Sequence, residues 1–117
     1  MSLLGKLFGN GPRLTPTHVH TEADFVREVL ESAVPVILDV WSPTCAPCKK
    51  LEPVLVRVAT KYQGRIKVAE TSTDAEPRLL ARLGVRATPT LVVFDQGHEV
   101  GRMAGFRPEG WFDQMID

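Results

Sequence analysis

The chain is 117 residues long, which suits one domain that buries its own core without disulfide cross-links. Its 14 lysines and arginines balance 14 aspartates and glutamates, so the formal net charge is zero and nothing indicates a nucleic-acid partner or a disordered acidic arm. The longest apolar stretches are only as long as strands, so we expect no membrane span and no membrane partner.

The N-terminal residues differ from the rest of the chain. We expect residues 1–16 to form an arm or linker and residues 17–117 to form the domain. Apolar residues between positions 3 and 8 have helical spacing, which leaves a short docking helix as the alternative, but glycines at positions 5, 9 and 11 interrupt them. Nothing here resembles a secretory cleavage site. The cytoplasm is therefore the simplest location, although a chain trimmed of an export signal would look the same.

The first predicted elements alternate strand and helix. Residues 17–20 are expected to form a short edge strand, and Thr21-Glu22-Ala23-Asp24 resembles a capping box that opens an amphipathic helix. Residues 36–41 are apolar on both faces, which is typical of a central strand covered on both sides. A second amphipathic helix pattern follows over residues 49–62.

The second half of the chain predicts a hairpin between two helices. Residues 66–71 alternate as a strand, and Asp74 is expected to cap a short helix that ends at Gly84. Two strands between residues 90 and 103 are separated by a turn so short that they must form an antiparallel hairpin. Pro108 opens a last helix. The order β-α-β-α-β-α-β-β-α predicts an α/β fold with a mixed central β-sheet and helices on both faces.

The only two cysteines stand between the central strand and the second helix, as Cys45-Ala46-Pro47-Cys48. At a helix start, backbone N–H groups and the positive end of the helix dipole lower the pKa of a thiol, so we expect Cys45 to be a nucleophile. Cys48 is close enough in sequence to close a disulfide, and Pro47 is tolerated in a first turn. The pattern indicates a redox site in a reducing compartment rather than a pair of inert buried thiols.

Metal binding is not expected. Two cysteines rarely supply enough ligands for a metal site. His18 and His20 alternate along the expected edge strand, far from the cysteines in sequence, and His98 lies in the hairpin turn. We interpret all three as surface histidines, with a zinc site at His18 and His20 as the less favoured alternative.

Asp39 is the second informative residue, because it interrupts an otherwise apolar strand. We expect it to be buried, and a buried carboxylate without a fixed positive partner has a raised pKa. The alternative is an acid that only hydrogen-bonds a strand edge.

From about Thr17 to the end, the chain resembles the thioredoxin family. The residues that carry the resemblance are Asp39-Val40-Trp41, Cys45-x-Pro47-Cys48-Lys49, Pro53, Asp74, Ala87-Thr88-Pro89-Thr90, Gly97 and Gly105. The resemblance implies a cis Thr88–Pro89 bond that faces the cysteine pair, and such bonds make up only about 5–6% of X-Pro bonds in folded proteins. It also implies that Asp39 lies behind Cys48 and deprotonates it through water.

The resemblance further implies a substrate groove. Its expected residues are Trp41, Pro43, Thr44, Ala46, Pro47, Thr88, Pro89 and the 104–106 loop with Gly105. The backbone at Thr88 would pair with an extended client peptide. A role for Trp41 in the core alone is the alternative to substrate contact.

Three residues depart from the family pattern. Ala46 replaces the usual glycine, and Thr44 stands where a second tryptophan is common. Glu70 replaces a lysine that faces the buried aspartate. Glu70 shares a strand face with Val68, so we hypothesise that Asp39 and Glu70 form a coupled pair that shares a proton near neutral pH. The alternative has Glu70 turned to solvent.

The leading functional prediction is a monomeric enzyme, a thiol–disulfide oxidoreductase that reduces disulfide-containing client proteins and is recharged by a thioredoxin reductase. It needs no cofactor, because the Cys45–Cys48 couple itself carries the electrons. One alternative is a binding adaptor with this fold. The other is a disulfide oxidase or isomerase in an oxidising compartment.

Overall fold

The computed structural model describes residues 13–117, in which five strands form one mixed sheet in the order β1-β3-β2-β4-β5. The strands are β1 (Thr17–His18), β2 (Val36–Trp41), β3 (Lys67–Ser72), β4 (Thr90–Asp95) and β5 (His98–Ala104). The helices are α2 (Glu22–Phe25), η1 (Val26–Leu30), α3 (Ala46–Lys61), α4 (Pro77–Leu83) and α5 (Glu109–Ile116). The predicted α/β class, element order and mixed sheet are confirmed.

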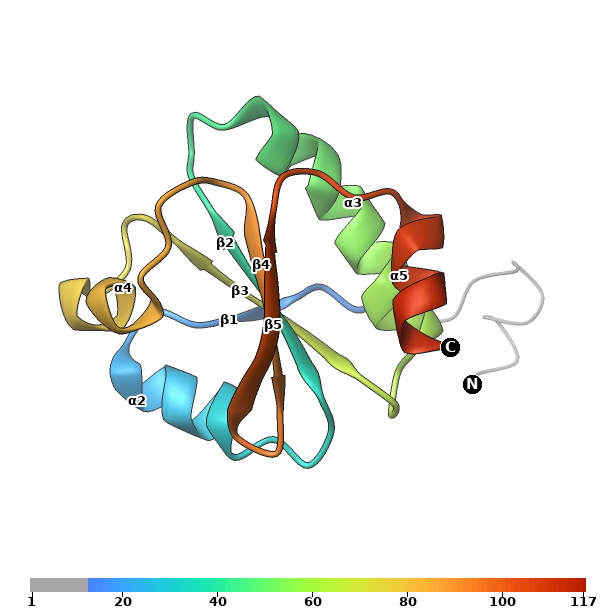
Figure 1. Cartoon of the computed structure of the whole chain (residues 1–117), viewed down its shortest axis with the longest axis horizontal. Helices are drawn as coiled ribbons and strands as arrows, with labels where there is room; N and C mark the ends of the chain where they lie inside the picture. Colours follow the sequence, from blue (N-terminus) through green and yellow to red (C-terminus); the bar gives the residue numbers. More distant parts are fainter. Residues whose placement is uncertain (1–12) are drawn as a thin grey trace.

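Strand β2 lies at the centre of the sheet, as its apolar sequence predicts. It pairs in parallel with β3 and antiparallel with β4, and β1 pairs in parallel with the far edge of β3. Helices α2 and α4 cover one face of the sheet, whereas α3 and α5 cover the other (Figure 1). Strand β2 ends at Trp41, and a short loop joins it to α3, which begins at Ala46.

The two-residue period of β2 divides its side chains between two cores. Val36, Leu38 and Val40 pack with residues of α2, η1 and α4. Ile37 packs in the second core with residues of α3 and with Phe112 of α5. Asp39 has the parity of Ile37, so its side chain points toward α3, the helix that begins with the cysteine pair.

The first helix is less regular than its pattern predicts. The predicted capping box is confirmed, because Thr21 Oγ1 accepts the Asp24 N–H at 3.0 Å and Asp24 Oδ2 accepts the Thr21 N–H at 3.1 Å. After one α-helical turn the chain widens into the π-helical stretch η1, in which the Glu31 N–H donates to the Val26 carbonyl at 2.9 Å.

The predicted cap of the fourth helix is wrong. Helix α4 begins at Pro77, with Glu76 rather than Asp74 in the capping position. Proline favours the first helical residue, where its missing N–H has no intrahelical partner, and this preference places the helix start three residues after Asp74. Asp74 lies exposed in the preceding turn. Gly84 ends the helix with φ 62°, as predicted.

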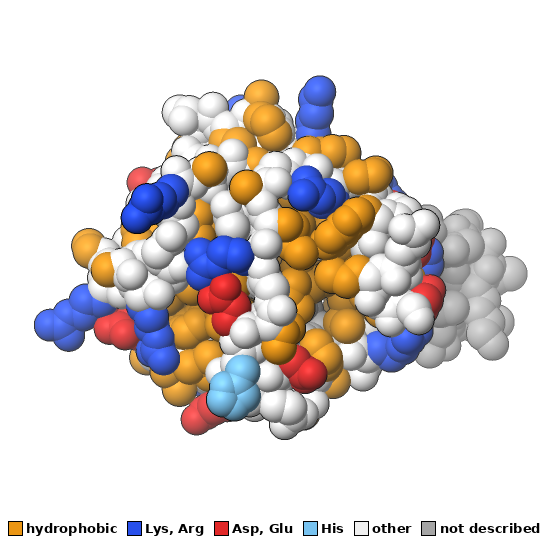
Figure 2. All heavy atoms as spheres, in the orientation of Figure 1, with side chains coloured by type: hydrophobic (Ala, Val, Ile, Leu, Met, Phe, Trp, Pro, Cys, Tyr) orange, Lys and Arg blue, Asp and Glu red, His pale blue; other side chains and the backbone are white. Residues whose placement is uncertain are grey.

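The predicted hairpin is confirmed as β4 and β5, which pair antiparallel. On the face seen in Figure 2, hydrophobic side chains gather between β5 and α5. Met103, Trp111 and Ile116 pack there, partly buried, against the second core. No helix within residues 13–117 is long and apolar enough to cross a membrane. Most of the predicted N-terminal arm, residues 1–12, lies outside the described residues.

Candidate active site

The two cysteines lie at the start of α3 and are joined by a disulfide. Cys45 is the N-cap residue, with an extended backbone, and its Sγ accepts the N–H of Cys48 at 3.2 Å. Pro47 lies in the first turn, where its missing N–H costs no helix bond. The structure thus has the oxidised pair at the helix start that the sequence predicts.

The two sulfur atoms have different surroundings. Cys45 is partly exposed, and its neighbours Ala46 and Pro47 are exposed, whereas Cys48 is only 4% exposed. A client disulfide can therefore approach Cys45 directly, while Cys48 faces the interior. This difference suits an attacking thiol followed by a resolving thiol.

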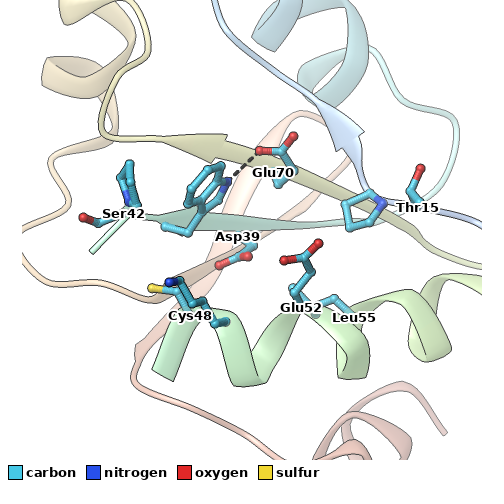
Figure 3. A pocket seen from close by; sticks show the side chains of 11 residues that line it. Thr15, Asp39, Ser42, Cys48, Glu52, Leu55 and Glu70 are labelled. Carbon is cyan, nitrogen blue, oxygen red and sulfur yellow. Dashed lines mark hydrogen bonds between the residues drawn. The ribbon is translucent and has the colours of Figure 1, made fainter. Parts of the chain in front are cut away.

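Behind Cys48 lies a cavity of about 440 Å³ that contains the side chain of Asp39 (Figure 3). Strand β2 supplies Asp39 and Trp41, strand β3 supplies Glu70, and helix α3 supplies Cys48 and Glu52. Asp39 is 5% exposed, and its Oδ1 has no hydrogen-bond partner among the described residues. The cavity therefore brings a buried, unpaired carboxyl group to the inner cysteine.

The pKa of Asp39 is raised to about 7. Burial is the largest cause, because it disfavours the charged carboxylate, and the negative charges of Glu70 and Glu52 add to it. The predicted rise is confirmed. A group with this pKa exchanges a proton near neutral pH, as a general base for a thiol requires.

The structure confirms the position of Glu70 that the Asp39–Glu70 hypothesis requires. The two residues are register partners on adjacent strands, and Glu70 faces the cavity as predicted. However, Glu70 Oε1 accepts the indole N–H of Trp41 at 2.7 Å, and Glu70 Oε2 lies 2.7 Å from Nδ1 of His18. The two Glu70 oxygens thus contact Trp41 and His18, and no hydrogen bond joins Glu70 to Asp39 among the described residues, where Asp39 Oδ1 has no partner. The negative charge of Glu70 is one cause of the raised pKa of Asp39.

The Thr88–Pro89 bond is cis, as predicted. Val40 and Thr90 are register partners, so Pro89 lies next to the end of β2. Thr88 and Ser42 line one small cavity, and the N–H of Gly105 donates to the Pro89 carbonyl at 2.8 Å. The structure therefore brings Thr88, Pro89 and Gly105 together beside the active-site loop.

The outer edge of the site, next to Cys45, is exposed at position 44, where the chain has threonine in place of the tryptophan that is common in the family. Thr44, next to Cys45, is exposed, and so is Pro43. Trp41 is half-buried and lines the cavity behind Cys48. Phe106, at the end of the predicted groove, is 40% exposed. Apolar surface on the rim is therefore supplied more by the 104–106 loop than by residue 44.

Two residues at this site were missed from the sequence. Glu52 lines the cavity and lies four residues after Cys48, so the period of α3 could have indicated it. His18 contacts Glu70, although 52 residues separate them. Only the pairing of β1 with β3 brings His18 there, and the sequence carries no direct signal of that register. The interpretation of His18 as a surface residue is otherwise correct, since its side chain is 60% exposed.

No group of three or more His, Cys, Asp or Glu side chains within residues 13–117 is arranged to hold a metal ion. The electron carrier that the site does contain is the cysteine pair, which passes two electrons as it changes between dithiol and disulfide. The class of protein that this chemistry defines is the thiol–disulfide oxidoreductase.

Comparison with known proteins agrees with this class. The family model described as thioredoxin matches residues 16–117. Thioredoxin 1 of Nostoc sp. is 38% identical over 97 residues, which cover 83% of this chain and 91% of the Nostoc protein. Thioredoxin 1 of Synechococcus elongatus is 37% identical, and thioredoxin of Porphyra purpurea 35% identical, over the same shares. The chain belongs to the thioredoxin family.

Family and site together support a thiol–disulfide reductase. They do not favour the alternatives of a binding adaptor, an oxidase or an isomerase. Thioredoxins, the family to which the chain belongs, act on disulfide-bearing substrates.

Proposed function

We propose that this reductase works in two exchange steps, with Cys45 as attacking thiol and Cys48 as resolving thiol. The Cys45 thiolate attacks one sulfur of a client disulfide, breaks that bond and releases the first client thiolate. A mixed disulfide joins Cys45 to the other client sulfur. The Cys48 thiolate then attacks Cys45 Sγ, which releases the second client thiolate and leaves the Cys45–Cys48 disulfide. The client gains two electrons, and the enzyme pair loses two.

The observation that carries this proposal is the position of Cys45 as N-cap of α3, with its Sγ 3.2 Å from the backbone nitrogen of Cys48. A thiolate there receives backbone donors and the positive end of the helix dipole, which favour the ionised nucleophile. Its partial exposure leaves room for a client sulfur.

We propose Asp39 as the base that takes the proton from Cys48 before the second step. The two side chains line the same cavity, and a pKa of about 7 lets the carboxyl group accept a proton at neutral pH and release it again. The cavity is large enough for water to connect them.

We propose a thioredoxin reductase as the electron donor, the cytoplasm as the location, and a monomer as the working form. A dithiol used as a reductant must be regenerated in a reducing compartment, and the two cysteines form the active pair alone, with no structural disulfide elsewhere in the chain. Client peptides would bind along Thr88 and Pro89 in an extended form.

Insulin reduction by dithiothreitol tests the proposal. The protein should accelerate precipitation of the insulin B chain, and Cys45→Ser should not. A rate equal to that of dithiothreitol alone would contradict the enzyme function. A reduction potential of about −270 mV for the Cys45–Cys48 couple would support a reductase, whereas one of about −120 mV would indicate an oxidant.

A further inference from the structure

Three neighbouring strands place one row of ionisable side chains behind the active site. His18 of β1 is the register partner of Glu70 of β3, and Glu70 is the register partner of Asp39 of β2. Register partners on adjacent strands point to the same face of a sheet. The row therefore leads from an exposed imidazole at the sheet edge, through a half-buried carboxylate, to the buried Asp39.

The contacts along this row are specific. His18 Nδ1 lies 2.7 Å from Glu70 Oε2. The other Glu70 oxygen accepts the Trp41 indole N–H at 2.7 Å, the dashed line in Figure 3. An ionised carboxylate can only accept hydrogen bonds, so Nδ1 is the donor in this contact whenever Glu70 is ionised. His18 thus holds one oxygen of Glu70 while the other oxygen is directed to Trp41.

We propose that His18 is a positioning residue of the reductase, which acts through Glu70 to set the charge that faces Asp39. When the imidazole is protonated, it offsets the negative charge of Glu70. When the imidazole is neutral, that charge acts on Asp39 in full. Histidine changes its charge between roughly pH 5 and pH 8, which is the range in which Asp39 exchanges its proton.

The sign of the effect follows from Coulomb's law. A positive His18 favours the ionised form of Asp39, and loss of that charge favours the protonated form. This inference rests on the proposed role of Asp39 only where it concerns the rate of the reaction.

The other charged groups near the row do not replace His18. His20, on the same edge segment, stacks on the His18 ring with centroids 6.0 Å apart, and its backbone N–H donates to Asp24 of α2. From α3, the groups that line the cavity are Lys49 and Glu52. Within the described residues, His18 contacts Glu70 and His20 does not, so His20 serves as a matched control.

Stability alone does not require the His18–Glu70 pair. The His18 side chain is 60% exposed, and ion pairs exposed to solvent contribute little to stability. Substitutions at His18 are therefore expected to leave the fold intact, and their effects on titration can be measured in folded protein.

Carbon-13 NMR of the Asp39 side-chain carboxyl group tests the proposal in the reduced full-length protein. His18→Gln keeps a hydrogen-bond donor without a charge, and His18→Lys keeps a positive charge at all working pH values. The Asp39 midpoint should be lowest in His18→Lys and highest in His18→Gln, with steps of a few tenths of a pH unit that shrink in high salt. His20→Gln should match the wild type.

The pH profile of client reduction provides the second measurement and should move with the NMR midpoint. Equal midpoints in both His18 variants would overturn the proposal. An effect of His20→Gln as large as that of His18→Gln would also overturn it. If the midpoint moves but the reduction profile does not, the charge link stands and the proposed role of Asp39 as base is the part that fails.

Discussion

Glu70 accepts a 2.7 Å hydrogen bond from the indole N–H of Trp41. Trp41 is the last residue of β2, and the active-site loop follows it directly, so this bond ties β3 to the residue from which the loop begins. A charged acceptor makes the bond stronger than one between neutral groups. An acid at position 70 therefore contributes to the geometry of the site as well as to its charge.

The proposed roles of the two cysteines predict a trapped intermediate. Cys48→Ser can still attack a client disulfide through Cys45, but it has no second thiol to resolve the mixed disulfide. A covalent adduct with the client should appear on a non-reducing gel and disappear with reductant, and insulin reduction should fall to the rate of dithiothreitol alone. Cys45→Ser should form no adduct. An adduct in Cys45→Ser instead would reverse the assigned order of attack.

Asp39 makes the stability of the fold depend on pH. Its pKa is 3.8 in its ordinary state and about 7 in the folded protein, so the folded state holds a proton that the unfolded chain releases between these values. The contribution of Asp39 to the free energy of unfolding is complete below pH 3.8 and is lost as the pH rises through about 7. Asp39→Asn does not titrate, so its free energy of unfolding should exceed that of wild type increasingly over this range, by up to about 4 kcal/mol above it.

Urea denaturation at several pH values measures this difference, and Asp24→Asn provides a contrast. Asp24 accepts hydrogen bonds from the backbone N–H groups of His20 and Thr21, and these bonds lower its pKa. The contribution of Asp24 to stability is therefore lost as the pH falls. The two variants should therefore change stability with opposite sign near neutral pH. Asp39→Asn should also slow insulin reduction, because it removes the proposed base. A stabilised and fully active variant would contradict that role.

The central part of the site could be predicted from the sequence for physical reasons. An acid within an apolar strand must be buried, and the two-residue period places Asp39 on the face of Ile37. The C-x-x-C spacing between a strand and a helix places Cys45 at a helix start, and the structure confirms this position. These predictions depend on local periodicity, which a single sequence contains.

The partners of Glu70 could not be predicted in the same way. His18 reaches Glu70 only because β1 pairs with β3, a contact across 52 residues. Strand periodicity gives the face of a side chain but not its neighbour on another strand. The sequence therefore predicts a coupled pair with Asp39 but neither of the contacts that Glu70 makes with His18 and Trp41. The prediction of the cap of α4 failed for a different reason. Asp74 and Pro77 are competing signals for the start of the helix, and the helix begins at the proline.

Glu70→Gln tests the charge link between the two acids. The amide oxygen can still accept the Trp41 N–H, but the negative charge that helps to raise the pKa of Asp39 is gone. The pKa of Asp39 should fall, so the pH profile of Cys48 alkylation should move to lower pH by a fraction of a unit. Glu31→Gln removes the same charge from an exposed site outside the cavity and should leave the profile in place. An unchanged profile in Glu70→Gln would exclude the link.

The capping box of α2 should affect stability without affecting the reaction. Thr21→Ala removes the Oγ1 that accepts the Asp24 N–H at 3.0 Å, and loss of such a cap typically costs about 1 kcal/mol. The urea midpoint should fall accordingly, while the rate of insulin reduction in the absence of urea should stay at the wild-type value, because Thr21 does not line the cavity behind Cys48. Thr73→Ala, at an exposed turn position, is the control and should not shift the midpoint comparably. A loss of activity in folded Thr21→Ala would show that the first helix influences the active site.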